Sequence, residues 1–239
     1  MSDAPSELLE WDTEFWGVRV ARVLGGSMTE ESRAEIDRWC VDNGVSCVYF
    51  LAEANDEETK AAAEGGGFFY TDSRVTLRKE VHKPRAVSAI PVRVAEDRDL
   101  EALEAIARSS HETTRFYHDP HFPDDRCGEL YAQWIRSTYA SDDVVLIIEH
   151  DGRAVAYVTC GLREGNTGYI GLIAVDASMR ERGLGAALAV AAHNWMVEHG
   201  VKHAAVVTQE RNVAAMHLIQ NAGYVVDSTH LWFHKWYDR

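Results

Sequence analysis

Cysteine, positive charge and long apolar runs are all scarce in this sequence, and each shortage excludes a class of protein. The four cysteines among 239 residues are widely spaced without a C-x-x-C pair, so neither a disulfide framework nor a zinc knuckle is indicated. The most apolar run, residues 183–192, is about half of the ~20 residues that span a bilayer. The first residues show no basic segment followed by an apolar one. We therefore expect a cytoplasmic protein without a membrane partner.

The charge balance argues against nucleic acid as a partner. There are 24 Lys and Arg residues against 38 Asp and Glu, a formal net charge of −14. Binding to a phosphate backbone depends on neutralising its charges with basic side chains, so this chain is poorly suited to it. Composition is otherwise ordinary, with 46% hydrophobic and 26% charged residues, enough for one large or two small globular domains.

The residue pattern divides the chain near Ala89 into two α/β parts. Residues 81–91 hold two of the five prolines and show no apolar periodicity, which predicts a connector. Before it we expect a small βαβαβ unit, residues 1–88, with strands within 12–23, 47–51 and 74–78 and helices at 30–41 and 55–64. Its role would be to support a site or a dimer interface, because it carries no motif for chemistry.

Residues 89–239 are predicted to form the larger part, in which a meander of strands gives way to alternating strands and helices. The Asp151-Gly152 pair is a hairpin signal. The predicted strands are 91–94, 144–149, 154–160, 169–175, 204–207 and a final pair, and the predicted helices are 97–108, 124–139, 183–199 and 212–222.

A loop rich in glycine and arginine precedes the third of these helices. Gly183 and Gly185 let the backbone approach a ligand at the helix N-terminus, where unpaired N–H groups and the helix dipole favour phosphate. Arg180 and Arg182 add positive charge at the same point. No Walker Gly-Lys-Ser/Thr is present, and Leu188 stands where a dinucleotide fingerprint needs Gly or Ala, so neither ATP nor NAD is indicated. Two glycines alone would favour a tight turn without a ligand.

Two motifs together resemble those of the GNAT superfamily of acyl-CoA-dependent N-acyltransferases. Residues 180–185, RERGLG, match its [RQ]-x-x-G-x-[GA] loop, and residues 212–224 match Asn-x-x-Ala-x-x-Leu-x-x-x-x-Gly-[FY]. The resemblance covers roughly residues 91–239 and implies a mixed, splayed sheet flanked by helices, with acetyl-CoA as co-substrate lying between diverging strands. It implies cofactor contacts by Ile173, Ala174, Val175, Arg180, Arg182, Gly183, Leu184, Gly185, Ala186 and Asn212.

The remaining segments resemble the dTDP-fucosamine acetyltransferases, which acylate the amine of a dTDP-linked 4-amino-4,6-dideoxyhexose. This resemblance rests on residues 11–23, 115–135 and 227–236, and extends the similarity to nearly the whole chain. It implies a small-molecule amine, a nucleotide sugar, as the acceptor. Within the aromatic loop 109–123, a diphosphate and a base would suit Arg115, Phe116 and Tyr117. The alternative is that the aromatic residues only anchor the loop.

The sequence departs from the family pattern at the position of the usual catalytic acid. Many members have a Tyr seven residues after the helix-opening Asn, and Ile219 occupies that position here. A coenzyme A thiolate is a good leaving group, so protonation by solvent is tolerable; weak candidates for proton transfer are His111, Glu112, Tyr224 and His217. No metal site is predicted, since His193 has no second ligand at metal spacing.

Two other functions stay open at this point. The acceptor could be a peptide N-terminus or a lysine, in which case the 109–123 loop would be dispensable. The chain could also be a degenerate fold that binds acyl-CoA without catalysis, which the absent tyrosine would favour. A homodimer is possible.

Overall fold

The computed structural model describes residues 4–163 and 166–237, which divide into two compact units. One unit comprises Met1–Arg74, Thr114–Phe122 and Thr229–Arg239, and the other comprises Val75–Thr113 and Pro123–Ser228. The connector and residues 75–80 thus belong to the second unit, and two later segments return to the first. Separate folding of residues 1–88 stays a prediction.

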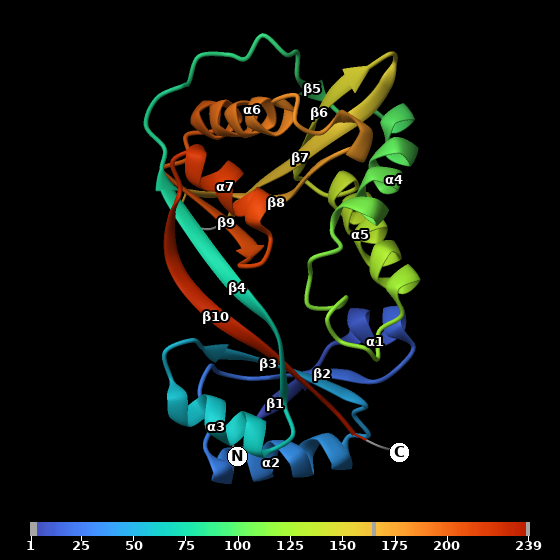
Figure 1. Cartoon of the computed structure of the whole chain (residues 1–239), viewed down its shortest axis with the longest axis vertical. Helices are drawn as coiled ribbons and strands as arrows, with labels where there is room; N and C mark the ends of the chain where they lie inside the picture. Colours follow the sequence, from blue (N-terminus) through green and yellow to red (C-terminus); the bar gives the residue numbers. More distant parts are fainter. Residues whose placement is uncertain (1–3, 164–165, 238–239) are drawn as a thin grey trace. The chain divides into compact units, whose positions relative to one another are not determined.

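The first unit is a small sheet with two helices on one face (Figure 1). Its strands β1 (Ser6–Leu8), β2 (Val20–Val23), β3 (Cys47–Glu53) and the end of β10 (Val225–Trp236) are neighbours in that order. β2 and β3 are parallel, and β1 and β10 are antiparallel to their neighbours. The helices α2 (Glu30–Asp42) and α3 (Glu57–Gly65) are capped by Thr29 and Asp56, whose side chains accept main-chain N–H groups.

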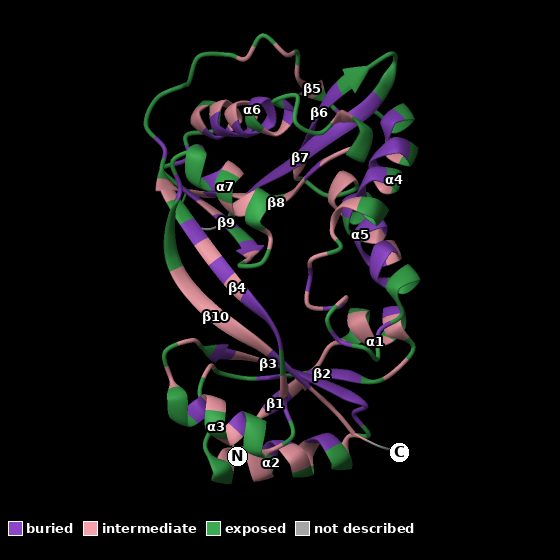
Figure 2. Cartoon of the chain, in the orientation of Figure 1, coloured by how far each residue is buried: buried purple, intermediate pink, exposed green. Residues whose placement is uncertain are grey.

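Alternation along β3 gives this sheet two different faces. Val48 and Phe50 belong to a core shared with α2 and α3, which also contains Phe68 and Phe233. Tyr49 points to the other side, where its ring lies 4.6 Å from the imidazole of His234. Both sides of β3 are therefore buried, as its almost continuous burial shows (Figure 2).

The second unit is built on a meander followed by a parallel strand. β5 (Arg93–Val94), β6 (Val144–His150), β7 (Arg153–Arg163) and β8 (Thr167–Val175) are antiparallel neighbours, and β9 (His203–Gln209) is parallel to β8. The predicted hairpin between β6 and β7 is confirmed, with φ of 49° at Asp151 and 78° at Gly152. β7 is buried from Ala154 to Gly161, because helices cover both faces.

Helices α4 (Leu100–Ser110) and α5 (Asp124–Tyr139) lie on one side of β7, and α6 (Leu184–Glu198) lies on the other (Figure 1). α7 (Val213–Asn221) packs beside α6. α6 places Leu184, Leu188, Met196 and three of its alanines in the main core of this unit. Among the described residues, no helix combines the length and apolar character that crossing a bilayer requires.

Two sequence predictions of local structure are wrong. Residues 10–16 form a helix, α1 (Glu10–Trp16), where a strand was expected from the aromatic content. The stacked rings of Trp11 and Phe15, one turn apart, and the left-handed Gly17 that ends the helix explain this result. The expected final pair of strands is the single long strand β10, which continues through Asp227 and Ser228 without a turn.

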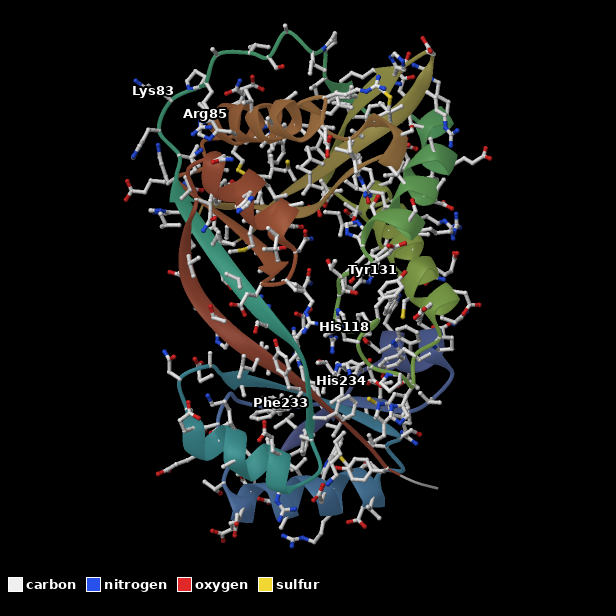
Figure 3. All side chains as sticks on the ribbon, viewed as in Figure 1. Lys83, Arg85, His118, Tyr131, Phe233 and His234 are labelled. Atoms are coloured by element: carbon white, nitrogen blue, oxygen red, sulfur yellow. The ribbon has the colours of Figure 1, made fainter. Side chains whose placement is uncertain are left out.

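The connector is fixed to α6 by hydrogen bonds. The main-chain N–H of Arg85 donates to the Asn194 side chain at 2.8 Å, and the Asn194 amide donates back to the Arg85 carbonyl at 3.1 Å. The His193 ring donates through Nε2 to the Lys83 carbonyl at 3.0 Å. Figure 3 labels Lys83 and Arg85 on this segment. A stretch without apolar periodicity is thus ordered by polar contacts.

Candidate active site

β8 and β9 part from each other halfway along their length. Their parallel register runs only from the pair Thr167 and His203 to the pair Ile170 and Val206. β8 continues to Val175 and β9 to Gln209. Residues 171–175 therefore border an opening between the strands, which is the splay that the sequence resemblance predicts.

The backbone of β8 is directed alternately toward β7 and toward this opening. Asp176 donates its N–H to the Val155 carbonyl at 2.8 Å, and the register pairs Tyr157 with Ala174. Because main-chain groups alternate in direction along a strand, Ala174 faces β7, whereas Ile173 and Val175 face the open side. Of the three strand residues predicted to contact the cofactor, two thus direct their N–H groups into the opening.

The loop between β8 and α6 leads into a helix N-terminus that no described side chain caps. Gly183 has φ of 77° and starts α6 without a capping bond from any described side chain. The first bond within the helix runs from Ala187 N–H to the Gly183 carbonyl at 3.1 Å. The N–H groups of residues 184–186 consequently have no acceptor within the helix, which is the arrangement that binds phosphate.

The charged residues of this loop frame the same helix end. Arg180 and Arg182 are exposed, and the Arg180 Nε–H group donates to the Val175 carbonyl at 3.3 Å. Glu181 between them has φ of 63°, an uncommon conformation for a residue with a side chain. The loop thus connects the open side of β8 to the α6 N-terminus.

Glycine is required at the two positions of the motif for different structural reasons. A Cβ on Gly183 would meet no described atom within 4 Å, so this position needs glycine for its positive φ. A Cβ on Gly185 would lie 3.3 Å from a methyl carbon of Leu218, so Gly185 allows α6 and α7 to approach closely. Gly185 therefore serves the packing of two helices as well as the loop.

Asn212 and Ile219 of the second motif both have structural roles. The Asn212 side chain caps α7, its Oδ1 accepting the Ala215 N–H at 3.1 Å. Contact of Asn212 with the cofactor stays a prediction. Ile219 is 1% exposed and belongs to the core of the second unit. Tyr224 is also buried there, and burial raises the pKa of its hydroxyl. His217 is exposed.

His111 is the proton-transfer candidate that the structure holds beside the sheet. Its Nε2 lies 3.2 Å from the hydroxyl of Tyr157, the β7 residue opposite Ala174, and its ring stacks on Tyr131 at 4.6 Å. Burial lowers the pKa of this imidazole to about 4, so it is neutral at pH 7. Glu112 beside it is exposed. The contact with Tyr157 depends on strand register, so no local sequence pattern predicts it.

The loop residues Arg115 and Phe116 pack inside the first unit. The Arg115 guanidinium lies 4.1 to 4.3 Å from the ring centroids of Tyr49, Phe116 and Trp232. Phe116 is buried, whereas Tyr117 is half-buried and His118 is exposed. Anchoring of the loop by Arg115 and Phe116 is thus observed, and acceptor binding by these two residues and Tyr117 stays a prediction.

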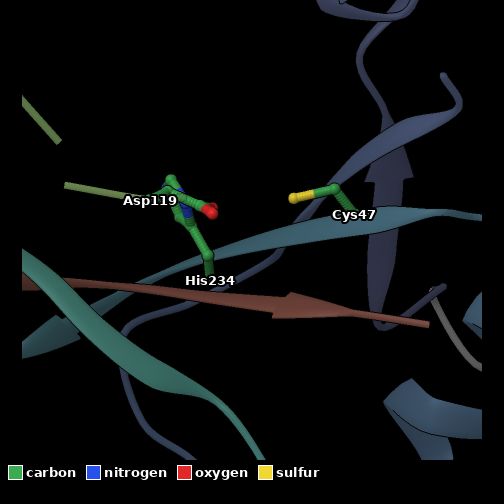
Figure 4. A group of neighbouring side chains, drawn as sticks. All are labelled: Cys47, Asp119 and His234. Carbon is green, nitrogen blue, oxygen red and sulfur yellow. The ribbon is translucent and has the colours of Figure 1, made fainter. Parts of the chain in front are cut away.

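A buried polar cluster that sequence reasoning missed holds the same loop. Figure 4 shows Asp119 and His234 side by side, with the Cys47 sulfur facing them. Asp119 accepts hydrogen bonds from His234 Nδ1 at 2.7 Å and Trp236 Nε1 at 2.9 Å. Arg115 Nη1 donates to His234 Nε2 at 2.8 Å. The alternation of His and Trp within the strand segment HLWFHKW was the available signal.

The protonation states of this cluster follow from burial and hydrogen bonding. Burial acts to raise the pKa of Asp119, but the bonds from His234 and Trp236 outweigh it and lower that pKa to about 2. Burial lowers the pKa of His234 to about 4, against the effect of Asp119. Cys47, Asp119 and His234 could together approach a metal ion. The Asp119 oxygens, however, already accept bonds from four donors, two of them on His121.

Comparison with known proteins places this site in a family. The profile of the Acetyltransferase (GNAT) family matches residues 100–224, more than half of the 239 residues. The chain belongs to this family. The GNAT match contains β8, the glycine loop, α6 and α7, and the predicted mixed α/β fold is confirmed.

The relatives of this GNAT chain include sugar-related proteins. It is 29% identical over 239 residues to a dTDP-fucosamine acetyltransferase of Escherichia coli O6:H1, covering 97% of this chain and 98% of the relative. It is 28% identical over 141 residues to the spore coat polysaccharide biosynthesis protein SpsD of Bacillus subtilis, covering 58% of this chain and 48% of the relative.

Solved GNAT structures share the fold along nearly the whole chain. A GCN5-related N-acetyltransferase from Sphaerobacter thermophilus has a TM-score of 0.67 at 16% identity and covers 97% of this chain and 76% of its own. Another from Kribbella flavida has a TM-score of 0.63 at 17% identity, with coverages of 98% and 88%. At these identities the likeness concerns the fold alone.

Proposed function

We propose that this GNAT protein transfers the acetyl group of acetyl-CoA to the amine of a dTDP-linked amino sugar. The assignment of acetyl-CoA is supported by the α6 N-terminus, which no described side chain caps and where the N–H groups of residues 184–186 suit a diphosphate. The observation that supports the acceptor is the similarity to dTDP-fucosamine acetyltransferase over 97% of the chain.

In the proposed reaction the neutral amine attacks the thioester carbonyl directly. The opening between β8 and β9 would hold the thioester, and the N–H groups of Ile173 and Val175 would stabilise the negative charge that develops on its oxygen. The coenzyme A thiolate leaves and takes a proton from solvent, since Ile219 supplies none. His111, neutral at pH 7, is the candidate to accept the proton of the amine.

The site of action would be the cytoplasm. All four cysteines are free and buried, and the burial of Cys160 raises the pKa of its thiol to about 12. Such thiols are inert, and a chain with free thiols suits a reducing compartment.

Thiol release from acetyl-CoA with a panel of acceptors tests this function. The panel contains dTDP-linked 4-amino-4,6-dideoxyhexoses, polyamines, and peptides with free N-termini or lysines. We expect turnover with the amino-sugar nucleotides and background rates with the others. Turnover with peptides alone would assign a protein N-acetyltransferase, and binding of coenzyme A without turnover on any acceptor would assign an acyl-CoA-binding module.

A further inference from the structure

β8 carries one residue more than β7 at the point where it leaves β9. The register of the two strands passes from the pair Val158 and Ile173 to the pair Cys160 and Ile170. Two residues of β8, 171 and 172, therefore stand opposite the single residue Thr159. Such a bulge bends a strand and ends its regular pairing. The parallel register with β9 ends at the same place, at Ile170.

The Thr159 side chain is built into this bulge. It is 1% exposed, and its Oγ1 accepts the N–H of Leu172 at 2.8 Å. A Cβ on Gly171 would lie 2.7 Å from the same Oγ1, closer than real Cβ atoms come to their neighbours. The hydroxyl of Thr159 thus occupies space that is available only because residue 171 is glycine.

The bulge determines which main-chain groups enter the opening. Main-chain groups alternate in direction along a strand, so one inserted residue reverses the alternation for everything that follows. Beyond the bulge, Ile173 and Val175 face the open side and Ala174 faces β7. A β8 strand that lost the bulge would direct a different set of N–H groups toward the thioester.

We propose that Thr159 is a positioning residue for acyl transfer: its hydroxyl holds the bulge and thereby aims the Ile173 N–H at the thioester oxygen. The proposal rests on the proposed function. An N–H donor displaced by a fraction of an ångström stabilises the developing oxyanion less, so the loss should fall on kcat.

Three variants test the hydroxyl. Thr159→Val keeps the shape and removes the acceptor, and we expect kcat on the dTDP-amino sugar to fall by about 10- to 100-fold while KM for acetyl-CoA rises only by about three- to fivefold. Thr159→Ser keeps the hydroxyl and should stay within about threefold of the parent. Thr59→Val is the matched control, because Thr59 is also 1% exposed and accepts the Met28 N–H at 2.9 Å. It should lower the melting temperature without lowering kcat.

A double-mutant comparison tests the pairing with Gly171. Gly171→Ala alone must displace the Thr159 hydroxyl. It should therefore lower kcat by about the same factor as Thr159→Ala, which removes that hydroxyl. In the Thr159→Ala background the clashing oxygen is gone, and Gly171→Ala should then cost no further activity. Two losses that multiply in the double variant would overturn the proposal.

An acceptor-independent measurement separates this proposal from the proposed function. Calorimetry with acetyl-CoA and with coenzyme A reports the thioester contact, and Thr159→Val should weaken acetyl-CoA binding at least threefold relative to coenzyme A. This ratio tests Thr159 even if no amino-sugar nucleotide is turned over, a result that would refute the proposed acceptor alone. An unchanged ratio together with unchanged kcat in folded Thr159→Val would refute the positioning role.

Discussion

Ala186 offers a test in which stability and cofactor binding should move in opposite directions. It is exposed in the first turn of α6, where no described side chain caps the helix. A carboxylate at a helix N-terminus stabilises by about 0.3–1 kcal/mol. At about 2–4 °C per kcal/mol for a chain of this size, Ala186→Glu should raise the melting temperature of the ligand-free protein by about 1–4 °C.

The same carboxylate should repel the diphosphate of coenzyme A. Two unit charges about 4 Å apart repel by about 1 kcal/mol in water and about 4 kcal/mol at an effective dielectric constant of 20. The lower figure corresponds to about fivefold weaker binding. Coenzyme A at a hundredfold excess over the parent Kd stabilises the parent by about 2.7 kcal/mol, and the variant should retain about 1.8 kcal/mol or less.

The assay is thermal unfolding with and without coenzyme A, supported by calorimetric Kd values. Ala186→Gln, equal in size and uncharged, is the control and should keep most of the protection. Gly185 is a poor choice for this test, because a Cβ there presses on Leu218 and would disturb the packing of α6 against α7. Equal coenzyme A affinity in the Glu variant, the Gln variant and the parent would show that the phosphates lie elsewhere.

Three further predictions concern Ile219, Arg115 and His234. Ile219→Tyr should not raise kcat and should cost about 1–3 kcal/mol of stability, since Ile219 is 1% exposed in the core; a tenfold rise in kcat with an altered basic limb of the pH profile would contradict this. Arg115→Ala should destabilise the protein by about 1–3 kcal/mol through lost ring and His234 contacts, measured by urea unfolding; a raised KM for the sugar nucleotide with unchanged stability would instead assign Arg115 to the acceptor. His234 has a pKa of about 4 in the folded protein against an ordinary value of 6.5, so its contribution to stability is present above pH 6.5 and is lost as the pH falls toward 4. From pH 7 to pH 5 this loss is about 2 kcal/mol, and His234→Gln should reduce the slope of the unfolding free energy, measured by urea unfolding, against pH; an unchanged slope would contradict this.

Elements and motifs that depend on neighbouring residues could be predicted from the sequence. The helix over residues 124–139 and the hairpin at Asp151-Gly152 follow from apolar spacing and from turn residues, and the structure contains both. The glycine loop was predicted for the same reason, because a helix N-terminus with glycine and arginine is a local feature. The strand prediction for residues 10–16 is wrong. Aromatic content favours strands in general, whereas Gly17 and the spacing of Trp11 and Phe15 favour a helix here.

Features that depend on strand register and on contacts between distant residues could be found only in the folded chain. The bulge that joins Thr159 to Gly171 and Leu172 requires strand pairing, which no local pattern encodes. Arg115 has the residue type expected of a phosphate ligand, yet its guanidinium lies among rings supplied by β3 and β10. The pairing of Asp119 with His234 likewise joins residues 115 positions apart. Whether a charged side chain binds a ligand or packs in the core depends on the partners that surround it once water is removed. Those partners come together only when the chain folds.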